Sequence, residues 1–462
     1  MAIGLAMDPV LIVGGGISGL STAYYLSQSG IPSVLFEKTS RLGGLIQTDL
    51  IQNCRLEAGP DSFLAAKPAV KELAHDLPGL ESQIISSNDS ARRVFIARAG
   101  CLVPLPAGMV MMAPGKWLPV LRSQLLSVRA KVRLLQETLR RPQQRAEDIS
   151  VGQFVEDHFG SEVSEFIADP LLSGVYGGNA ASLSAASVLP RFVAYEQQYG
   201  SLIRGVRREL RARNSSAPLF QSFRNGMQVL TDSLARANSD RVRVVHADVS
   251  QVQRSGSLWQ VRAGEQTLSS PDLVLACPAH VCGRLLENSA FPLAEELSAI
   301  PYSSAILVTL VYERAALGHP LDGFGFLVPA AQRKVLAAAT WVSVKFPVRT
   351  PPHLAALRGF IVGAEAAGLL NAPDSAVIDL VREDFSRWMG TNARPLFSTI
   401  HRWPDSMPQY VVGHAERREK IARLLEHYPG LFLAGNAYDG VGIPDCIRGT
   451  QEISKLVACR RV

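Results

Sequence analysis

Apolar and polar positions near the start of the chain follow a strand, turn, helix and strand pattern. Residues 10–13 read Val-Leu-Ile-Val, a short apolar run that predicts a buried strand. Residues 20–30, LSTAYYLSQSG, have helical apolar spacing, and Gly30 is placed to cap the helix. A second strand is expected in PSVLFEK, residues 32–38. These elements fit within about 30 residues, the size of a βαβ unit, and they imply a parallel sheet.

More strands are needed to complete that sheet, and suitable apolar runs occur only much later. They are residues 242–253, 258–263, 272–278 and 430–436. The sequence therefore predicts a discontinuous Rossmann-like domain assembled from residues 1–66, 214–299 and 404–462.

Two insertions separate these pieces. Residues 67–213 are expected to be largely helical and to form a domain of their own. Residues 300–403 are expected to form a mixed α+β domain for the substrate, with strands in 305–313, 323–329 and 357–365. A helix is expected near residues 375–389, with Asp374 as its cap. The predicted fold class is α/β, with a discontinuous nucleotide-binding domain, a mixed second domain and a helical insertion.

Composition supports an ordered globular protein. The chain has 462 residues, 47% apolar and 19% charged, which is long for a single core. Six cysteines without a CxxC pair favour a reducing compartment such as the cytoplasm, and nine dispersed histidines show no metal-ligand spacing. The apolar N-terminus lacks a basic first region and is interpreted as a strand, not as a signal peptide. No apolar run reaches the roughly 18 to 20 residues of a membrane-spanning helix.

The net charge of +6 is concentrated in two runs. The first spans Arg122 to Arg145 and the second spans Arg204 to Arg213. Each fits a solvated helix face. The first run follows the apolar residues 106–121, so a basic amphipathic surface resting on anionic lipid is the alternative. Neither run has interleaved aromatic residues, which disfavours nucleic-acid binding.

The turn after the first strand carries the pattern G-x-G-x-x-G at Gly14, Gly16 and Gly19. Such glycines allow a tight turn, approach of a pyrophosphate to backbone N–H groups, and close packing of helix on strand. Glu37 ends the second strand, where a carboxylate can accept both ribose hydroxyls of an adenosine. This context predicts dinucleotide binding.

A second glycine turn identifies the dinucleotide. Arg41-Leu42-Gly43-Gly44 resembles the RxGG signature of flavoproteins of the amine oxidase and phytoene desaturase superfamily. The resemblance implies FAD, with Arg41, Gly43 and Gly44 closing over its pyrophosphate and ribityl chain. It also implies that the last strand ends at Gly435 and that the next helix begins under the flavin ring. Pro444 suits the first turn of that helix, and Asp445 suits a cap or a ribityl contact.

The stretch GNAYDGVGIPDCI, residues 435–447, is similar to the C-terminal signature of oxygen-dependent protoporphyrinogen and coproporphyrinogen III oxidases. The likeness covers most of the chain, because further family-like segments follow in order. They are residues 57–68, 171–192, 323–329, 346–351 and 402–414. The resemblance implies that a porphyrinogen loses six electrons to flavin N5 in three hydride transfers during heme biosynthesis, with molecular oxygen as the final acceptor. No residue is assigned as a general base.

The resemblance supplies the expected site residues. Cofactor contacts are expected from Gly14, Gly16, Ile17, Ser18, Gly19, Glu37, Lys38, Arg41, Gly43, Gly44, Gly59, Val249, Gly435, Asn436, Val441, Gly442 and Ile443. Substrate contacts are expected from Phe324, Phe326, Leu327 and Phe346, with Arg93 for a propionate. Plant and animal relatives use an arginine to bind the propionate, and the matching residue here is Val94. The resemblance therefore leaves the propionate-binding residue open.

Several alternatives stay open at this point. Protoporphyrinogen and coproporphyrinogen are both candidate substrates, although GPDSFLAAKP is more like the coproporphyrinogen-oxidising enzymes. Another flavin amine oxidase or a carotenoid desaturase would fit the cofactor motifs, and Lys345 is the one lysine considered for an amine-oxidase role. A flavin-binding protein without catalysis is the third reading. Peripheral membrane contact through residues 106–145 and a homodimer are further expectations.

Overall fold

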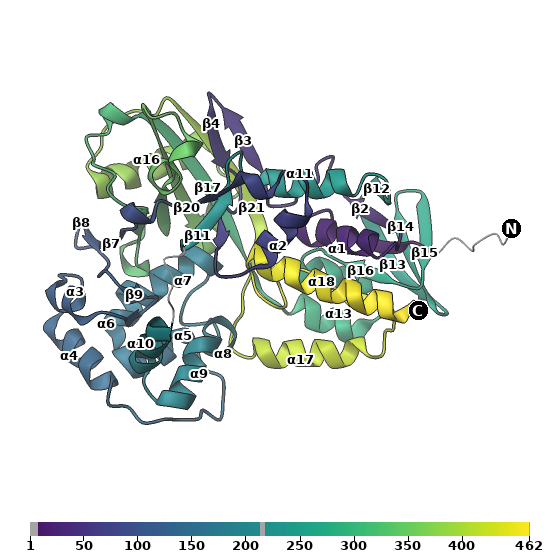
Figure 1. Cartoon of the computed structure of the whole chain (residues 1–462), viewed down its shortest axis with the longest axis horizontal. Helices are drawn as coiled ribbons and strands as arrows, with labels where there is room; N and C mark the ends of the chain where they lie inside the picture. The colour runs from purple at the N-terminus through teal and green to yellow at the C-terminus, as the bar shows by residue number, and fades with distance from the viewer. Residues whose placement is uncertain (1–7, 213–217, 462) are drawn as a thin grey trace.

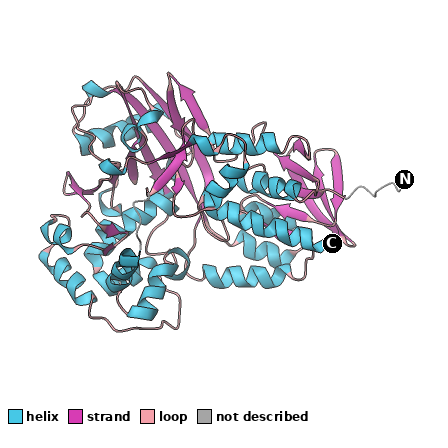
Figure 2. Ribbon diagram, in the orientation of Figure 1, coloured by secondary structure: helices cyan, strands magenta, loops and turns pink. Residues whose placement is uncertain are grey.

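The structure is a computed structural model that describes residues 8–212 and 218–461. Residues 1–7, Arg213 of the second basic run and the expected domain boundary at 213–214 lie outside these residues. The fold consists of a parallel sheet with its covering helices, a larger mixed sheet, and a group of short helices beside the larger sheet (Figures 1 and 2). The N-terminal and C-terminal segments both lie with the parallel sheet.

The parallel sheet has five strands in the order β12-β2-β1-β16-β22, and every neighbouring pair is parallel. The strands are β1 (Val10–Val13), β2 (Ser33–Glu37), β12 (Val242–His246), β16 (Leu273–Leu275) and β22 (Leu431–Leu433). Helices α1 (Ile17–Gln28) and α18 (Ile443–Arg460) cover one face, with Leu26 and Val457 packed against Ile12. Helix α1 is followed by its cap residue Ser29 and then by Gly30, whose φ is +76°. The predicted α/β fold and its Rossmann-like sheet are confirmed.

The prediction that residues 258–263 join the parallel sheet is wrong. They form β14 (Leu258–Ala263), which pairs antiparallel with β13 (Val249–Ser255) and β15 (Gln266–Ser270). Short turns at Gly256 and Gly264, with φ of +61° and +59°, reverse the chain here, whereas a parallel pair needs a long crossover. Trp259 of this meander packs on the second face of the parallel sheet, together with α12 (Ala279–Leu286) and α13 (Phe291–Ser298).

The second sheet has seven strands in the order β21-β17-β20-β19-β18-β7-β8. They are β7 (Val94–Arg98), β8 (Cys101–Pro104), β17 (Tyr302–Glu313), β18 (Gly325–Leu327), β19 (Ala338–Trp341), β20 (Leu354–Val362) and β21 (Phe397–Pro408). All pairs are antiparallel except β18 with β7. Helix α16 (Asp374–Met389) covers one face and confirms the helix expected near residues 375–389.

Two details differ from the sequence-based expectation. Asp374 lies in the first turn of α16 and not at its N-cap, and its carboxylate pairs with Arg402 at 2.5 Å. Residues 67–213 are not helical throughout, because β7 and β8 complete the second sheet and β6 (Ile84–Ser86) pairs with β11 (Phe220–Phe223). In β7, Phe95 and Ala97 pack on the face covered by α16 and Ile96 packs on the other face, an alternation that is typical of a strand.

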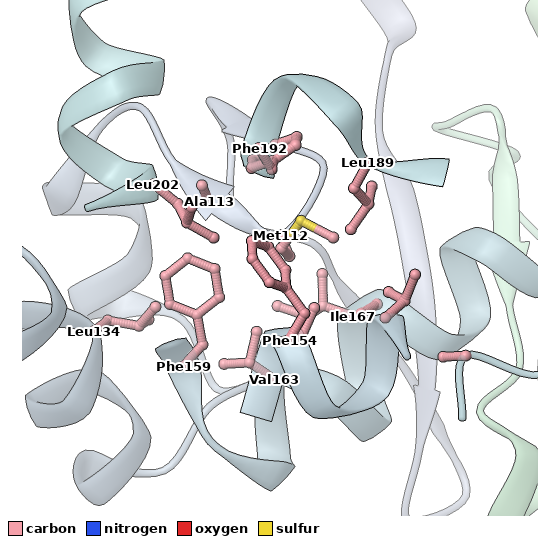
Figure 3. Packing of buried hydrophobic residues seen from close by; sticks show 14 of the residues in the cluster. Met112, Ala113, Leu134, Phe154, Phe159, Val163, Ile167, Leu189, Phe192 and Leu202 are labelled. Carbon is pink, nitrogen blue, oxygen red and sulfur yellow. The ribbon is translucent and has the colours of Figure 1, made fainter. Parts of the chain in front are cut away.

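The helices between α3 and α10 share one apolar core that is shown in Figure 3. They are α3 (Trp117–Arg122), α4 (Val128–Glu137), α5 (Val151–Phe159), α6 (Ser161–Val163), a π-helical turn (Ser164–Ala168), α7 (Asp169–Tyr176), α8 (Ala185–Val188), α9 (Pro190–Tyr199) and α10 (Leu202–Ala212). Phe154 and Phe159 of α5 fill the centre, and Leu134 of α4 lies beside them. Leu327 of β18 also packs against this core, so the helices lie on the sheet face that α16 leaves open.

Within residues 8–212 and 218–461, every helix is too short or too polar to cross a bilayer.

Candidate cofactor and substrate site

The glycine turn between β1 and α1 is packed too closely for side chains. Gly14 has φ of +109°, and a Cβ on it would lie 2.5 Å from the carbonyl oxygen of Ala276. A Cβ on Gly19 would lie 1.8 Å from the carbonyl oxygen of Gly14. These contacts are the tight turn and the close helix–strand approach that the pattern predicted.

The turn presents free backbone donors at the start of α1. Gly16 is the N-cap residue, and no side chain caps the helix. Among the described residues, no acceptor lies within hydrogen-bond distance of the N–H groups of Ile17, Ser18 and Gly19. Unpaired N–H groups and the positive end of the helix dipole favour an anion, so the turn fits a pyrophosphate.

Glu37 lies beside this turn at the end of β2. One carboxylate oxygen accepts from the N–H of Gly15 at 2.8 Å, and the other accepts from the N–H of Thr39 at 2.9 Å. The neighbouring strand β12 ends opposite Glu37, and His246 at that end contacts the carbonyl oxygen of Thr39 at 2.7 Å. Val249 is buried at the beginning of the next strand, while Lys38 is exposed. The carboxylate is therefore fixed where an adenosine ribose would follow the pyrophosphate.

Arg41 shapes the second glycine turn. Its guanidinium donates to the carbonyl oxygens of Leu42, Gly44 and Ile46, at 3.0 Å for Leu42 and 2.9 Å for Ile46. Gly43, with φ of +110°, donates to the carbonyl oxygen of Gly15 at 2.8 Å. The two glycine turns are thus joined side by side, and Arg41 holds the second one closed.

A third group of predicted residues lies at the start of α18. Gly435 has φ of +141° and Gly440 has φ of +131°, whereas Gly442 has φ of −78° and is the N-cap of α18. The helix begins at Ile443 with Pro444 next, as expected for its first turn. Asn436 and Val441 lie in the loop between these glycines. The strained loop therefore brings bare backbone and a helix N-terminus together.

Two side chains that the sequence did not single out fix this loop. The hydroxyl of Tyr410 donates to the carbonyl oxygen of Asn436 at 2.7 Å and accepts from the N–H of Gly440 at 3.0 Å. Lys67 donates to both carboxylate oxygens of Asp445 at 2.6 Å. Asp445 therefore pairs with a lysine here, where the sequence suggested a cap or a ribityl contact. Lys67 ends the segment GPDSFLAAK, but nothing in that segment indicates a partner so far along the chain.

Gly59 lies where the chain passes from the parallel sheet to the second sheet. A Cβ on it would lie 1.8 Å from the carbonyl oxygen of Leu45. Its own carbonyl oxygen accepts from Arg358 of β20, and the indole N–H of Trp403 donates to the carbonyl oxygen of Ala58 at 2.6 Å. The segment is therefore clamped onto the open face of the second sheet.

The expected substrate residues divide between the two faces of that sheet. Phe326 is buried against Phe385 of α16 on the closed face, because side chains alternate along β18. Leu327 lies on the opposite face, toward the helical core. Phe346 is buried, with its ring centre 5.4 Å from the Nζ of Lys345. Phe324 is buried next to β18.

Arg93 and Val94 give no buried cation at the expected position. The guanidinium of Arg93 pairs with Asp322 at 2.7 Å, and its side chain is 65% exposed. Val94 lies opposite Gly325 in the sheet. The cation that the resemblance implies for a propionate is therefore not found at this position.

Buried charges gather around Gly59 instead. The Nζ of Lys345 lies 3.0 Å from both carboxylate oxygens of Asp61, and Arg358 lies 3.9 Å from Asp61. Burial alone would raise the pKa of Asp61, but Lys345 and Arg358 together hold it below its ordinary value. The carboxylate of Glu57 pairs with Arg349 in the interior.

The thiols and histidines offer little redox or metal chemistry of their own. All six cysteines are free, and burial raises the pKa of Cys446 to about 12. No group of three or more potential metal ligands occurs among residues 8–212 and 218–461. The arrangement as a whole fits an adenosine diphosphate at the glycine turns, with a sheet face beyond it for a second molecule.

Comparisons with known proteins agree with this geometry. Residues 17–454 match the family described as flavin containing amine oxidoreductase. The chain is 31% identical to coproporphyrinogen III oxidase of Bacillus subtilis, over 95% of both chains. It is 28% identical to the chloroplastic protoporphyrinogen oxidase of Nicotiana tabacum, over 97% of this chain and 85% of that one. A crystal structure of a candidate protoporphyrinogen oxidase from Exiguobacterium sp. 255-15 superposes with a TM-score of 0.88 at 28% identity, over 99% of this chain and 100% of that one.

The match begins with α1, directly after Gly16, and covers the second glycine turn, the second sheet and the first two thirds of α18. The chain belongs to the family of flavin-containing amine oxidoreductases.

Proposed function

We propose that the protein oxidises a porphyrinogen to the corresponding porphyrin with FAD as its cofactor, in heme biosynthesis. The observation that carries the proposal is the end-to-end similarity to proteins named for this activity, at 31% identity over 95% of the chain. The unpaired N–H groups at the start of α1 and the carboxylate of Glu37 support FAD as the cofactor.

When bound, FAD supplies a ring that accepts electrons from the substrate two at a time and passes them to molecular oxygen. The residues that would hold its pyrophosphate are those of the first glycine turn, Gly14 to Gly19, and Glu37 would hold the ribose. The loop from Gly435 to Gly442 and the N-terminus of α18 would lie against the ring system. There the helix dipole favours negative charge.

The open face of the second sheet is the proposed wall of the substrate site. Phe360, Trp403 and Met407 form a half-buried apolar patch on it, and Leu327 lies on the same face. Such a surface suits a broad, flat macrocycle and excludes water from it. The main role of these residues would be to orient the macrocycle. We assign no general base.

We propose coproporphyrinogen III as the substrate in preference to protoporphyrinogen IX. The segment GPDSFLAAKP is more like that of the coproporphyrinogen-oxidising enzymes. The relatives with that name are 30–31% identical to the chain, and the plant protoporphyrinogen oxidases are 28–29% identical. The two molecules differ in the number of propionates, so cations in the site bear directly on this choice.

Anaerobic mixing of the purified protein with each porphyrinogen tests the activity. We expect the flavin absorbance to bleach, and we expect porphyrin fluorescence to rise in repeated turnovers after air is admitted. Faster bleaching by coproporphyrinogen III supports the proposed substrate. Bleaching only by an amine or a carotene precursor would support another oxidase of the superfamily, and bound FAD that no substrate bleaches would support a non-catalytic flavin protein.

One observation bears on the amine-oxidase alternative. The Nζ of Lys345 is bound by Asp61 and by the hydroxyl of Ser62, at 3.0 Å and 3.1 Å. These contacts place Lys345 among carboxylate and hydroxyl oxygens, an environment that fits an acid substrate better than an amine.

We further propose peripheral contact with an anionic membrane. Helix α4 exposes Val128, Val132 and Leu135, whose spacing places them on the side away from the buried Leu134. Leu139 is exposed in the turn directly after the helix, and these four residues form the α4 stripe. A nearby hollow of about 530 Å³ is lined by four arginines of α10, Arg204, Arg207, Arg208 and Arg211. An apolar stripe next to clustered cations fits a surface that rests on anionic lipid. The homodimer stays a prediction that light scattering can test.

A further inference from the structure

A cluster of five charged side chains lies where the segment after β4 (Cys54–Glu57) meets the second sheet. Its members are Glu57, Asp61, Lys345, Arg349 and Arg358. Lys345 and Arg358 both approach Asp61, at 3.0 Å and 3.9 Å, and Arg349 pairs with Glu57. The two groups lie close enough for Arg358 to interact electrostatically with Glu57 and Arg349, so the five residues form one cluster.

The cluster has more positive than negative charge. Three cations and two carboxylates leave one positive charge when all five are ionised. Arg358 is 1% exposed, Lys345 is 8% exposed and Glu57 is 5% exposed, so this charge is shielded from water. A buried charge without a counter-charge is costly, so a ligand that brings a carboxylate to this cluster would relieve that cost.

The guanidinium of Arg358 is also incompletely hydrogen-bonded. One terminal nitrogen donates to the carbonyl oxygen of Gly59, but its buried Nε has no hydrogen-bond partner among the described residues. A guanidinium carries five donors in a planar fork that matches a carboxylate. The unpaired Nε therefore leaves capacity for an acceptor from outside the chain.

Arg358 points to the open face of the second sheet. Its neighbours Leu357 and Ile361 along β20 pack with α16 on the closed face, so Arg358 and Phe360 lie on the other one. The guanidinium carbon lies 4.7 Å from the centre of the Phe360 ring. Phe360 and Thr340, which is opposite Arg358 in the sheet, are both half-buried and so are partly accessible. The excess charge is thus next to the proposed substrate wall.

We propose that Arg358, supported by Lys345, binds a propionate carboxylate of the substrate and so selects porphyrinogens that carry free acid side chains. This inference rests on the proposed function, because it names the groups that recognise the same substrate. Asp61 sets the strength of the site, since its carboxylate competes with the propionate for both cations.

Substitutions of Arg358, Lys345 and Asp61 are expected to change substrate binding in different ways. Arg358→Met and Lys345→Met remove a cation and should weaken binding of the acid substrate. Asp61→Asn removes the competing carboxylate with little change in volume and should strengthen it. Charge-assisted hydrogen bonds in a dry site lead us to expect a loss of roughly 10- to 100-fold for Arg358→Met, and a smaller loss for Lys345→Met.

The experiment compares the free acid with its ester. The kcat/KM of the FAD-loaded protein is measured for coproporphyrinogen III and for its tetramethyl ester, which has the same ring and no carboxylates. Equilibrium binding of the two corresponding porphyrins, followed by fluorescence, gives a readout that does not depend on turnover. We expect Arg358→Met to lose activity and affinity for the acid, and to change less than about twofold for the ester.

Controls separate charge recognition from folding. Arg262→Met removes an exposed arginine from the meander at β14 and should leave the acid-to-ester ratio unchanged. FAD content and the thermal midpoint of every variant are compared with the parent protein. If Arg358→Met fails to fold, the opposite shifts expected for Lys345→Met and Asp61→Asn carry the test.

The outcomes distinguish this inference from the function on which it rests. If the parent protein oxidises neither porphyrinogen, the proposed function fails, and the porphyrin-binding data then decide whether the cations recognise a carboxylate. If oxidation occurs but all three variants keep the parental acid-to-ester ratio, the inference is overturned. If the variants change the reduction potential of the flavin but keep the acid-to-ester ratio, the charged cluster acts on the cofactor and not on the substrate. That outcome would also overturn the inference.

Discussion

At the scale of single residues, the close packing of the glycines in the proposed cofactor site was predictable, and the side chains that contact them were not. Gly14 and Gly19 stand out because a tight turn and a close helix approach are local properties of the chain. Arg358 binds the carbonyl oxygen of Gly59, which is 299 residues away, and no local pattern indicates such a contact. The substrate phenylalanine chosen from sequence, Phe326, lies on the closed face because a short strand gives little information about which face is buried.

Gly14 should not tolerate a methyl group. In Gly14→Ala the new Cβ would meet the carbonyl oxygen of Ala276 in a backbone region with φ of +109°. We expect a loss of bound FAD and of roughly 1–3 kcal/mol in the free energy of unfolding. Absorbance of the purified protein and urea titration measure the two effects. Gly30→Ala is the matched control, because Gly30 also has positive φ, of +76°, but its Cβ would enter open space. Equal FAD loss in both variants would contradict the prediction.

His414 should make the protein sensitive to mild acid. The imidazole is stacked on Tyr410 with ring centres 4.1 Å apart, and burial, Arg418 and Arg417 lower its pKa from 6.5 to about 4. Below pH 6.5 the imidazole of His414 takes up a proton in the unfolded chain, whereas in the folded chain it stays neutral until the pH approaches 4. Stability from this group is therefore complete above pH 6.5 and is lost as the pH falls toward 4, on the order of 3 kcal/mol in total.

Urea unfolding at a series of pH values checks this dependence. His414→Phe keeps an aromatic ring against Tyr410 and should flatten the curve between pH 6.5 and 4. The exposed His75 provides the control, since His75→Gln should leave the acid limb of the curve intact. A variant curve as steep as that of the parent protein would show that other groups cause the loss.

At the scale of elements, the sequence predicted the helices and strands of the parallel sheet well. Strand β1 and helix α1 can be recognised from the periodicity of their apolar residues alone. The prediction failed for β14, where the alternation is that of a half-exposed antiparallel strand. It also failed for β7, which was assigned to a helical region. Strand β14 pairs with its two chain neighbours across the short turns at Gly256 and Gly264, and the prediction missed these hairpins. Strand β7 pairs with β18, which lies far away in the sequence, and no local pattern indicates that contact.

The buried pair of Glu57 and Arg349 should be essential for joining these elements. Arg349 also donates to the hydroxyl of Ser222 and to the carbonyl oxygen of Phe223 in β11, at 2.6 Å and 2.9 Å. Arg349→Met leaves Glu57 buried without its cation, so we expect a loss of about 3–5 kcal/mol in the free energy of unfolding. The double variant with Glu57→Gln should recover part of this loss, as measured by chemical denaturation. Additive losses would argue against a direct coupling.

At the scale of the whole molecule, the helical group combines a closed core with an open apolar stripe. Phe154 and Phe159 lie inside, whereas Leu139 is 81% exposed at the end of the α4 stripe. The sequence indicated a solvated basic helix face in this region, with a lipid-binding surface as the alternative. Which side chains of α4 point outward became clear only from its packing on α5, and that packing is what supports a membrane contact.

Removal of the stripe should weaken membrane binding and leave catalysis intact. Leu135→Ser with Leu139→Ser is expected to reduce co-sedimentation with phosphatidylglycerol vesicles several-fold, because less apolar area enters the interface. High salt should also release the parent protein, since part of the attraction is screened. Leu50→Ser, which changes a 67% exposed leucine on β3 (Thr48–Ile51), is the control. Unchanged sedimentation of the double variant would exclude α4 as the contact.

The outer strand β22 and helix α18 come from the last part of the chain, yet they complete the sheet that begins with β1. On the ribosome, the first glycine turn therefore emerges long before the loop at Gly435 that faces it. A complete site for the prosthetic group therefore requires that synthesis has passed the start of α18. A message that stops before the codon for Gly435 would yield a colourless product, even though both glycine turns near the start of the sequence had been translated.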